Sequence, residues 1–379
     1  MTVDRILPTD EAHELIALTT ELADRELAPR AADFEARAEF PREVLRTLGR
    51  SGLLGLPYPE EYGGAGQPYE VYLQVLEILA SRWLTIAEAV SVHTLACYPV
   101  ATYGNDELRK RLPDMLGGEL LGAYCLSEPQ GGSDAAALTT RAVRDGDRYL
   151  VSGTKAWITH ATHADFYNIF CRTGGPGAKG ISCLLADAGT PGISPQTPER
   201  TMGLRASPVA QIAFDDAPVP ADRLVGSEGI GFTIAMTALD SGRLGIAACA
   251  VGLAQAALDY AVGYARERQQ FGRPIIDFQG LGFLLADMAT QVSAARALTL
   301  AAARLRDAGR PYSIEAAKAK VFATDVAMKV TTDAVQVLGG AGYVADHPVE
   351  RYMREAKVLQ IVEGTNQIQR LVISRSLAR

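Results

Sequence analysis

The sequence has few cysteines, and none of them belongs to a C-x-x-C pair. Five are spread over 379 residues, at Cys97, Cys125, Cys171, Cys183 and Cys249. Scattered single cysteines argue against a disulfide framework or a zinc site, and they suit a reducing compartment. The five histidines show no metal-ligand spacing either, so we expect no metal site.

Long apolar runs and a strong excess of one charge are also missing. No segment approaches the roughly 20 apolar residues that a membrane-spanning helix needs. The net charge of −7 argues against nucleic acid or an anionic membrane surface as a partner. Residues 1–18 contain acids and no apolar run of the signal-peptide type, so we expect a cytoplasmic protein. Without a G-x-S-x-G or P-loop motif, a hydrolase or NTPase function has no support.

The character of the chain changes twice along its length, and 379 residues are too many for a single hydrophobic core. Residues 1–119 repeat apolar positions at helical spacing, which predicts a helical domain. Within it, the apolar stretch 71–100 predicts a buried pair of helices. Residues 120–225 contain short alternating segments between glycine and proline clusters, which predicts a compact β domain.

Residues 226–379 are rich in alanine and helical in pattern. Long apolar-faced segments with short connections predict an antiparallel four-helix bundle. The four predicted helices span roughly 230–268, 278–308, 313–338 and 348–377.

The first motif with possible chemistry is 124-YCLSEPQGGSD-134. Gly131 and Gly132 allow backbone N–H groups to approach a phosphate, and the hydroxyls of Ser127 and Ser133 add donors. An ordinary loop between domains explains this stretch about equally well.

The second motif is 155-KAWITHA-161. The Trp157 ring can stack on a planar heteroaromatic group, and Thr159 can hydrogen-bond its polar edge. A single tryptophan in a strand is more often a core residue. The position shortly after the glycine-rich stretch favours ligand binding.

Two further motifs, 266-RERQQFGRPIIDFQ-279 and 336-QVLGGAGY-343, lie at predicted helix ends. Arg268 and Arg273 are cations that can meet a diphosphate. Taken singly, arginines at a helix end are usually solvated or cap carbonyls, and glycines there usually terminate the helix.

The last motif is 358-VLQIVEGTNQIQR-370, which sets one acid, Glu363, after an apolar run and before Gly364. A solvated helix end and a base held in a dry pocket are both compatible with these residues alone.

Together these motifs resemble those of the acyl-CoA dehydrogenase family of flavoproteins. SEPQGGSD, AWIT, ERQQFG, FQ, QVLGGAGY and EGTNQIQR each match a family motif, in the family's order and over nearly the whole chain. The resemblance implies a mainly α fold with a β middle domain: a helical N-terminal domain, a β-barrel-like middle domain and a C-terminal four-helix bundle. It also implies a homotetramer, built as a dimer of dimers, with FAD at a subunit interface.

The resemblance further implies which residues contact FAD. Those for the flavin and its phosphates are Tyr124, Leu126, Ser127, Gly132 and Ser133, with Trp157 and Thr159 at the isoalloxazine ring. Those for the FAD of the neighbouring subunit are Arg268, Phe271, Gln279, Gln336, Leu338, Gly339 and Gly340. Thr365 and Gln367 are also expected to touch FAD.

The implied reaction is α,β-dehydrogenation of an acyl-CoA to the trans-2-enoyl-CoA, with electrons passed to an electron-transfer flavoprotein. A base removes the α-proton while a β-hydride passes to flavin N5. In most of the family the base is the glutamate of E-G-T, here Glu363. A minority carries it on a bundle helix in an L-D-x-E-R context, where this sequence has Gly242. The resemblance therefore assigns the base to Glu363.

The residues expected to meet the substrate are Ser133, Asp240, Arg243, Val362 and Gly364. Asp240 and Arg243 are placed near the CoA pantetheine, and Gly364 leaves room for the thioester. Val362 replaces a tyrosine of many relatives, so we expect a bulkier or branched acyl chain to be admitted. Another acid, Glu88, lies in an apolar stretch, and we expect it at the surface rather than at the far end of the acyl pocket.

Three alternatives remain open at this point. One is an oxidase of the same fold that uses oxygen on an acyl-CoA or a nitroalkane. Another is a dehydrogenase that acts on an acyl-carrier-protein thioester. The third is a non-catalytic flavin-binding scaffold, which the presence of Glu363 and Arg268 disfavours.

Overall fold

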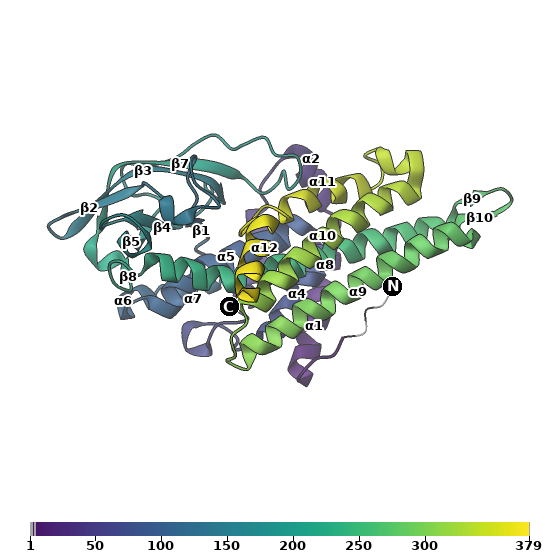
Figure 1. Ribbon diagram of the computed structural model, residues 1–379, viewed down its shortest axis with the longest axis horizontal. Coiled ribbons are helices and arrows are strands. Elements are labelled where there is room, and N and C mark those ends of the chain that lie inside the picture. The colour runs from purple at the N-terminus through teal and green to yellow at the C-terminus, as the bar shows by residue number, and fades with distance from the viewer. Residues whose placement is uncertain (1–2, 4, 379) are drawn as a thin grey trace.

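The computed structural model describes residue 3 and residues 5–378, and its elements follow the predicted order of helices, strands and helices. In Figure 1 the β-sheet lies at one end of an elongated molecule, and the long C-terminal helices extend away from it. The predicted fold class, mainly helical with a β middle domain, is confirmed.

The N-terminal helices include the predicted buried pair. They are α1 (Asp10–Leu22), α2 (Ala31–Arg37), α3 (Arg42–Arg50), α4 (Tyr69–Arg82), α5 (Leu84–Tyr103), α6 (Asp106–Arg109) and α7 (Leu112–Leu116). The Thr9 side chain accepts a hydrogen bond from the Ala12 N–H and so caps α1. The buried pair is α4 and α5, separated only by Trp83, whose extended backbone (φ −158°, ψ 104°) interrupts the helix.

A buried carboxylate ties these helices to the β region. Glu35 in α2 accepts a hydrogen bond from the Trp83 indole N–H at 2.9 Å and another from the Thr85 hydroxyl. Its second oxygen accepts from the backbone N–H groups of Arg205 at 2.7 Å and Ala206 at 3.3 Å. These bonds fix the start of α5 against the segment that leads into β7.

The β middle region is a sheet in the order β6-β7-β3-β2-β4-β5-β8, and β1 pairs parallel with β4. Its strands are β1 (Gly122–Cys125), β2 (Arg141–Asp145), β3 (Arg148–Thr159), β4 (Phe166–Arg172), β5 (Ile181–Asp187), β6 (Ile193–Pro195), β7 (Val209–Pro220) and β8 (Leu224–Val225). The hairpin predicted around Gly146 is β2 and β3, which pair antiparallel.

The C-terminal region begins with three long helices, as predicted. Its elements are α8 (Gly231–Glu267), β9 (Gln269–Gln270), β10 (Arg273–Pro274), α9 (Gln279–Asp307), α10 (Ser313–Leu338), α11 (Val349–Leu359) and α12 (Asn366–Leu377). The strands β9 and β10 form a small antiparallel hairpin between α8 and α9.

The prediction of a single fourth helix over 348–377 is wrong, because this segment forms two helices, α11 and α12. Glu363 (φ 51°) and Gly364 (φ 88°) both adopt left-handed backbone between them. Consecutive left-handed residues cannot continue a right-handed helix. Thr365 then caps α12 by accepting a hydrogen bond from the Ile368 N–H.

Two helices, α5 and α8, are long and apolar enough to cross a membrane by length and composition, although we expected no such segment. In α5, 89% of the most apolar window is buried inside the protein, and in α8 the share is 83%. A helix that is apolar on all sides is typical of a protein core as well as of a membrane span. The burial identifies both as core helices.

Glycine allows α8 to pass very close to α4. A Cβ on Gly252 would collide with the carbonyl oxygen of Glu77 and lie 2.8 Å from the Cβ of Ala80, both in α4. Since α8 also packs against α5 and α10, it joins the N-terminal and C-terminal helices.

We expect Gly252→Ala to destabilise the protein by about 1–3 kcal/mol, because the added methyl group forces α4 and α8 apart. The matched control is Gly263→Ala in the same helix, where an added Cβ meets no atom within 4 Å. Alanine favours the helix over glycine by about 1 kcal/mol, so this control should not lower the melting temperature. Equal melting temperatures for the two variants would contradict the close crossing.

Candidate functional site

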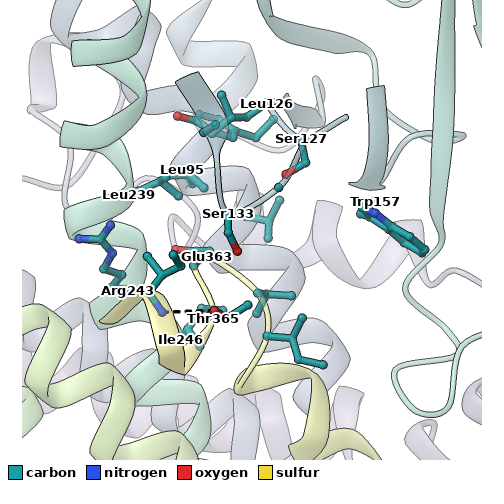
Figure 2. Close-up of a pocket in the computed structure, with 18 of the residues that line it drawn as sticks. Leu95, Leu126, Ser127, Ser133, Trp157, Leu239, Arg243, Ile246, Glu363 and Thr365 are labelled. Atoms are coloured by element: carbon teal, nitrogen blue, oxygen red, sulfur yellow. Dashed lines mark hydrogen bonds between the residues drawn. The ribbon is translucent and has the colours of Figure 1, made fainter. Parts of the chain in front are cut away.

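A cavity of about 470 Å³ brings most of the predicted site residues together. It lies between α5, α8, the segment after β1, the end of β3 and the turn between α11 and α12 (Figure 2). The predicted residues that line it are Tyr124, Leu126, Ser127, Gly132, Ser133, Trp157, Thr159, Arg243, Val362, Glu363, Gly364 and Thr365. They come from regions far apart in the sequence, so the tertiary fold assembles the site.

The other predicted FAD-binding residues lie outside this cavity. They are Arg268, Phe271, Gln279, Gln336, Leu338, Gly339, Gly340 and Gln367. Most belong to the β9–β10 hairpin region or the end of α10, and Figure 1 shows the hairpin at the far end of the long helices from the sheet. Phe271 is 93% exposed there. Their action on the FAD of a neighbouring subunit stays a prediction.

Glu363 lies on the turn between α11 and α12, and Figure 2 shows it near Arg243 and Ser133. Within the described residues, neither of its buried carboxyl oxygens has a hydrogen-bond partner. Burial raises the pKa of this carboxyl to about 8, and the negative charge of Glu88 adds to the rise. The positive charges of Lys320 and Arg243 oppose the increase in pKa. The structure thus favours the dry pocket over the solvated helix end.

Gly242 in α8 provides the space for this carboxyl group. A Cβ at Gly242 would lie 2.9 Å from the Glu363 Cδ and still closer to Oε2. The position where a minority of relatives carry the base is therefore filled here by the side chain of Glu363.

Two side chains that the sequence analysis missed, Lys320 and Gln369, hold the turn that carries Glu363. The Lys320 ammonium group donates to the Gly364 carbonyl and to Asn366 Oδ1, each at 2.9 Å. The Gln369 amide donates to the carbonyls of Gly364 at 2.9 Å and Glu363 at 3.3 Å. Left-handed backbone at a glutamate persists only where the surroundings enforce it, and these bonds do so.

Lys320 is fully buried, and burial lowers the pKa of its ammonium group to about 7. A signal for it was present in the sequence. It shares one face of α10 with Ala316, Ala319 and Ala323, at helical spacing, and all three are buried. A lysine in the middle of an apolar stripe indicates a buried acceptor nearby.

An irregularity in β3 turns Trp157 toward the cavity. The register of β3 against β7 shifts between Lys155 and Ile158, and Trp157 has a positive φ of 61°. A bulge redirects a side chain, and the indole is 64% exposed at the edge of the cavity. The alternative of a core tryptophan is wrong.

A buried ion pair, also missed in the sequence, anchors the loop that carries Ser127 and Ser133. Glu128 Oε1 accepts from the Lys155 ammonium group at 2.8 Å. The same carboxylate accepts backbone N–H bonds from Thr139 at 2.7 Å and Thr140 at 2.9 Å. The ends of the loop are therefore fixed while its glycine-rich middle faces the cavity.

Asp240 and Arg243 form an ion pair of 2.6 Å on α8. Asp240 also accepts a hydrogen bond from Ser313 at 2.8 Å and does not line the cavity, whereas Arg243 does. Asp240 therefore orients Arg243 in this structure, and its contact with CoA stays a prediction.

The expectation that Glu88 lies at the surface is wrong. Glu88 is 4% exposed and lines the cavity, because nearly every residue from Leu84 to Val100 of α5 is buried and the helix has no solvated face. Burial raises the pKa of its carboxyl to about 7, although hydrogen bonds from Ser207 and Thr159 oppose this.

The cavity residues fit FAD. The exposed Trp157 ring offers a flat face to a planar ring system. The hydroxyls of Ser127 and Ser133 offer hydrogen-bond donors. A Cβ at Gly132 would meet no atom within 4 Å, so its backbone borders space that a ligand can occupy.

We expect Glu363→Gln to raise the melting temperature, and to raise it more at pH 8.5 than at pH 5.5. The pKa of Glu363 is about 8 when folded, against 4.5 for an ordinary glutamate, so the folded state binds the proton more tightly. This contribution to stability is complete below pH 4.5 and is lost as the pH rises through 8, amounting to on the order of 5 kcal/mol. Glutamine does not titrate. An equal melting-temperature difference at both pH values would contradict the raised pKa.

The chain is similar over its full length to known acyl-CoA dehydrogenases. An acyl-CoA dehydrogenase of Bacillus subtilis (strain 168) is 44% identical over 372 residues, covering 97% of this chain and 98% of that protein. A chain solved in a study of the electron transferring flavoprotein of Acidaminococcus fermentans has a TM-score of 0.97 and 43% identity, covering 100% of both chains. Butyryl-CoA dehydrogenase from Megasphaera elsdenii has a TM-score of 0.96 and 38% identity, again covering 100% of both.

Three family models account for nearly the whole sequence. The acyl-CoA dehydrogenase N-terminal domain matches residues 9–119, the middle domain residues 123–217 and the C-terminal domain residues 229–378. The chain therefore belongs to the acyl-CoA dehydrogenase family of FAD-dependent oxidoreductases.

Proposed function

We propose that this protein dehydrogenates a short-chain acyl-CoA to the trans-2-enoyl-CoA, with Glu363 as the base that removes the α-proton. The observation that carries the proposal is the unpartnered carboxyl group of Glu363, whose oxygens are buried in the cavity. The similarity to a butyryl-CoA dehydrogenase supports a short chain.

The properties of Glu363 suit this proton transfer. The α-proton of a thioester is weakly acidic, and a carboxylate whose pKa is raised to about 8 is a stronger base than one in water. The flexible side chain is not fixed by any hydrogen bond within the described residues, so its oxygens are available to the substrate.

The turn also offers a donor for the thioester carbonyl. In the described part of the chain, the Glu363 backbone N–H has no hydrogen-bond acceptor. A preorganised N–H group stabilises the negative charge that develops on a carbonyl oxygen when the α-proton leaves. Lys320 and Gln369 hold this N–H in place through the neighbouring carbonyls.

FAD, when bound, supplies the acceptor for the β-hydride. Tyr124, Leu126, Ser127, Gly132, Ser133, Trp157, Thr159 and Thr365 would hold it from within one chain. The exposed residues of the β9–β10 hairpin, including Phe271, would reach the FAD of a second subunit in a homotetramer. The similar chain from the study of the electron transferring flavoprotein of Acidaminococcus fermentans supports an electron-transfer flavoprotein as the electron acceptor.

The test is anaerobic titration of Glu363→Gln with butyryl-CoA, following the flavin absorbance. We expect the rate of flavin reduction to fall by about 10²–10⁴-fold, because the general base is removed. Flavin content should stay unchanged, since glutamine has the same shape. The matched control, Glu107→Gln at an exposed site, should reduce its flavin at the normal rate. Near-normal reduction in Glu363→Gln would refute the assignment, and peroxide formation by the normal enzyme in air would favour an oxidase.

We expect Gly242→Ala to slow flavin reduction at least tenfold without loss of flavin. The added methyl group takes the space of the Glu363 carboxyl and forces the base from its position. Gly263→Ala in the same helix is the control. Unchanged kcat in Gly242→Ala would show that the base can work from another position.

A further inference from the structure

A second carboxyl, that of Glu88, borders the same cavity, and the proposed proton transfer does not use it. Glu88 Oε1 accepts a hydrogen bond from the Thr159 hydroxyl at 3.3 Å, and Oε2 accepts one from the Ser207 hydroxyl at 3.1 Å. An ionised carboxylate has about four acceptor positions. About half of the hydrogen-bonding capacity of Glu88 is therefore unused.

Four other buried glutamates have a cationic partner or a fuller set of hydrogen bonds, whereas Glu363, the proposed base, has no hydrogen-bond partner among the described residues. Glu77, Glu128 and Glu355 each form an ion pair with an arginine or a lysine. Glu35 accepts four hydrogen bonds. Among residues 5–378, Glu88 has neither a cationic partner nor a full set of donors. A buried carboxyl group without compensation is costly, so a partner from outside the chain is the simplest explanation for it.

The cavity wall next to Glu88 is apolar. Val92 and Leu95 follow Glu88 at i+4 and i+7, on the same face of α5. Met236 and Leu239 of α8 line the cavity as well, and Figure 2 shows Leu95 and Leu239 together on one side of it. This wall suits an alkyl chain. A purely alkyl chain that reached Glu88, however, would bury its carboxyl without adding a donor.

We propose that Glu88 binds a hydrogen-bond donor, a hydroxyl or an ammonium group, on the acyl chain of the substrate. The inference rests on the proposed function, because it takes this cavity as the acyl site. It narrows the substrate class to short acyl thioesters with a polar donor beyond the β-carbon, since the α- and β-carbons are the reacting atoms.

The negative charge of Glu88 also affects which acyl chains the cavity accepts. Glu88 and Glu363 are both acids of one cavity, and the charge of Glu88 helps to raise the pKa of Glu363. An acyl chain that ends in a carboxylate would add a third negative group and be repelled. An ammonium group would instead offset the charge of Glu88.

The experiment compares CoA thioesters that share a chain and differ only at its end. Valeryl-CoA, 4-hydroxybutyryl-CoA and 4-aminobutyryl-CoA place a methyl, a hydroxyl and an ammonium group at the same position, and glutaryl-CoA carries a carboxylate. The kcat/KM values of flavin reduction are measured for the flavin-loaded enzyme and for Glu88→Gln and Glu88→Val. Dissociation constants are measured in Glu363→Gln, which binds without turnover.

We expect the hydroxyl or the ammonium thioester to exceed valeryl-CoA in kcat/KM by at least tenfold. This ratio should fall to about one or below in Glu88→Val, because a site with unpaired polar groups discriminates against the methyl analogue and an apolar site does not. Which of the two donors gains the preference identifies the natural group. Glu107→Gln, which changes an exposed acid outside the cavity, is the control and should keep the ratio.

A ratio of one or less in the normal enzyme, or the same ratio in Glu88→Val, would overturn the proposal. If Glu88→Val does not fold, the same ratio is compared in Glu88→Gln, which keeps the shape of the side chain and removes its charge. Failure of the proposed function looks different. In that case no acyl-CoA, valeryl-CoA included, would reduce the flavin.

Discussion

The structure depends on keeping one carboxyl group out of water without a partner. Glu363 is placed on left-handed backbone, between two helices that a regular sequence pattern would have joined. Lys320 and Gln369 stabilise that turn by bonding its carbonyls, not its carboxyl. The backbone is therefore fixed while the carboxyl group stays free. The free-energy cost of burying the unpartnered carboxyl group lowers the stability of the fold and does not slow the reaction.

The central helix α8 links this arrangement to the rest of the chain. It places Arg243 at the cavity, leaves space for the Glu363 carboxyl group at Gly242, and packs closely on α4 through Gly252. Because α4 is followed almost at once by α5, the same packing sets the position of Glu88 opposite α8. The position of Glu88 is thus set by helix packing that lies outside the cavity itself.

Periodicity and turn residues predicted the element order and the hairpin of β2 and β3, because those patterns follow local backbone geometry. The family resemblance of the motifs predicted about half of the residues that line the cavity. The break at Glu363 was not predicted, since apolar spacing continues across it and the hydrogen bonds of Lys320 and Gln369 to its carbonyls enforce it. Glu88 was misplaced because a single acid is normally solvated. Glu88 is buried because α5 is buried on every side, and the spacing of apolar residues in the sequence did not reveal that burial.

Gly242 has a consequence for how such a pocket can change over time. The two places from which a carboxylate can serve this cavity share one volume, so occupying one requires the other to be empty. Moving the proposed base from the turn to α8 would need two substitutions, and either one made first gives a crowded pair of acids or no acid at all. A direct exchange between the two positions would therefore pass through a strained or inactive variant.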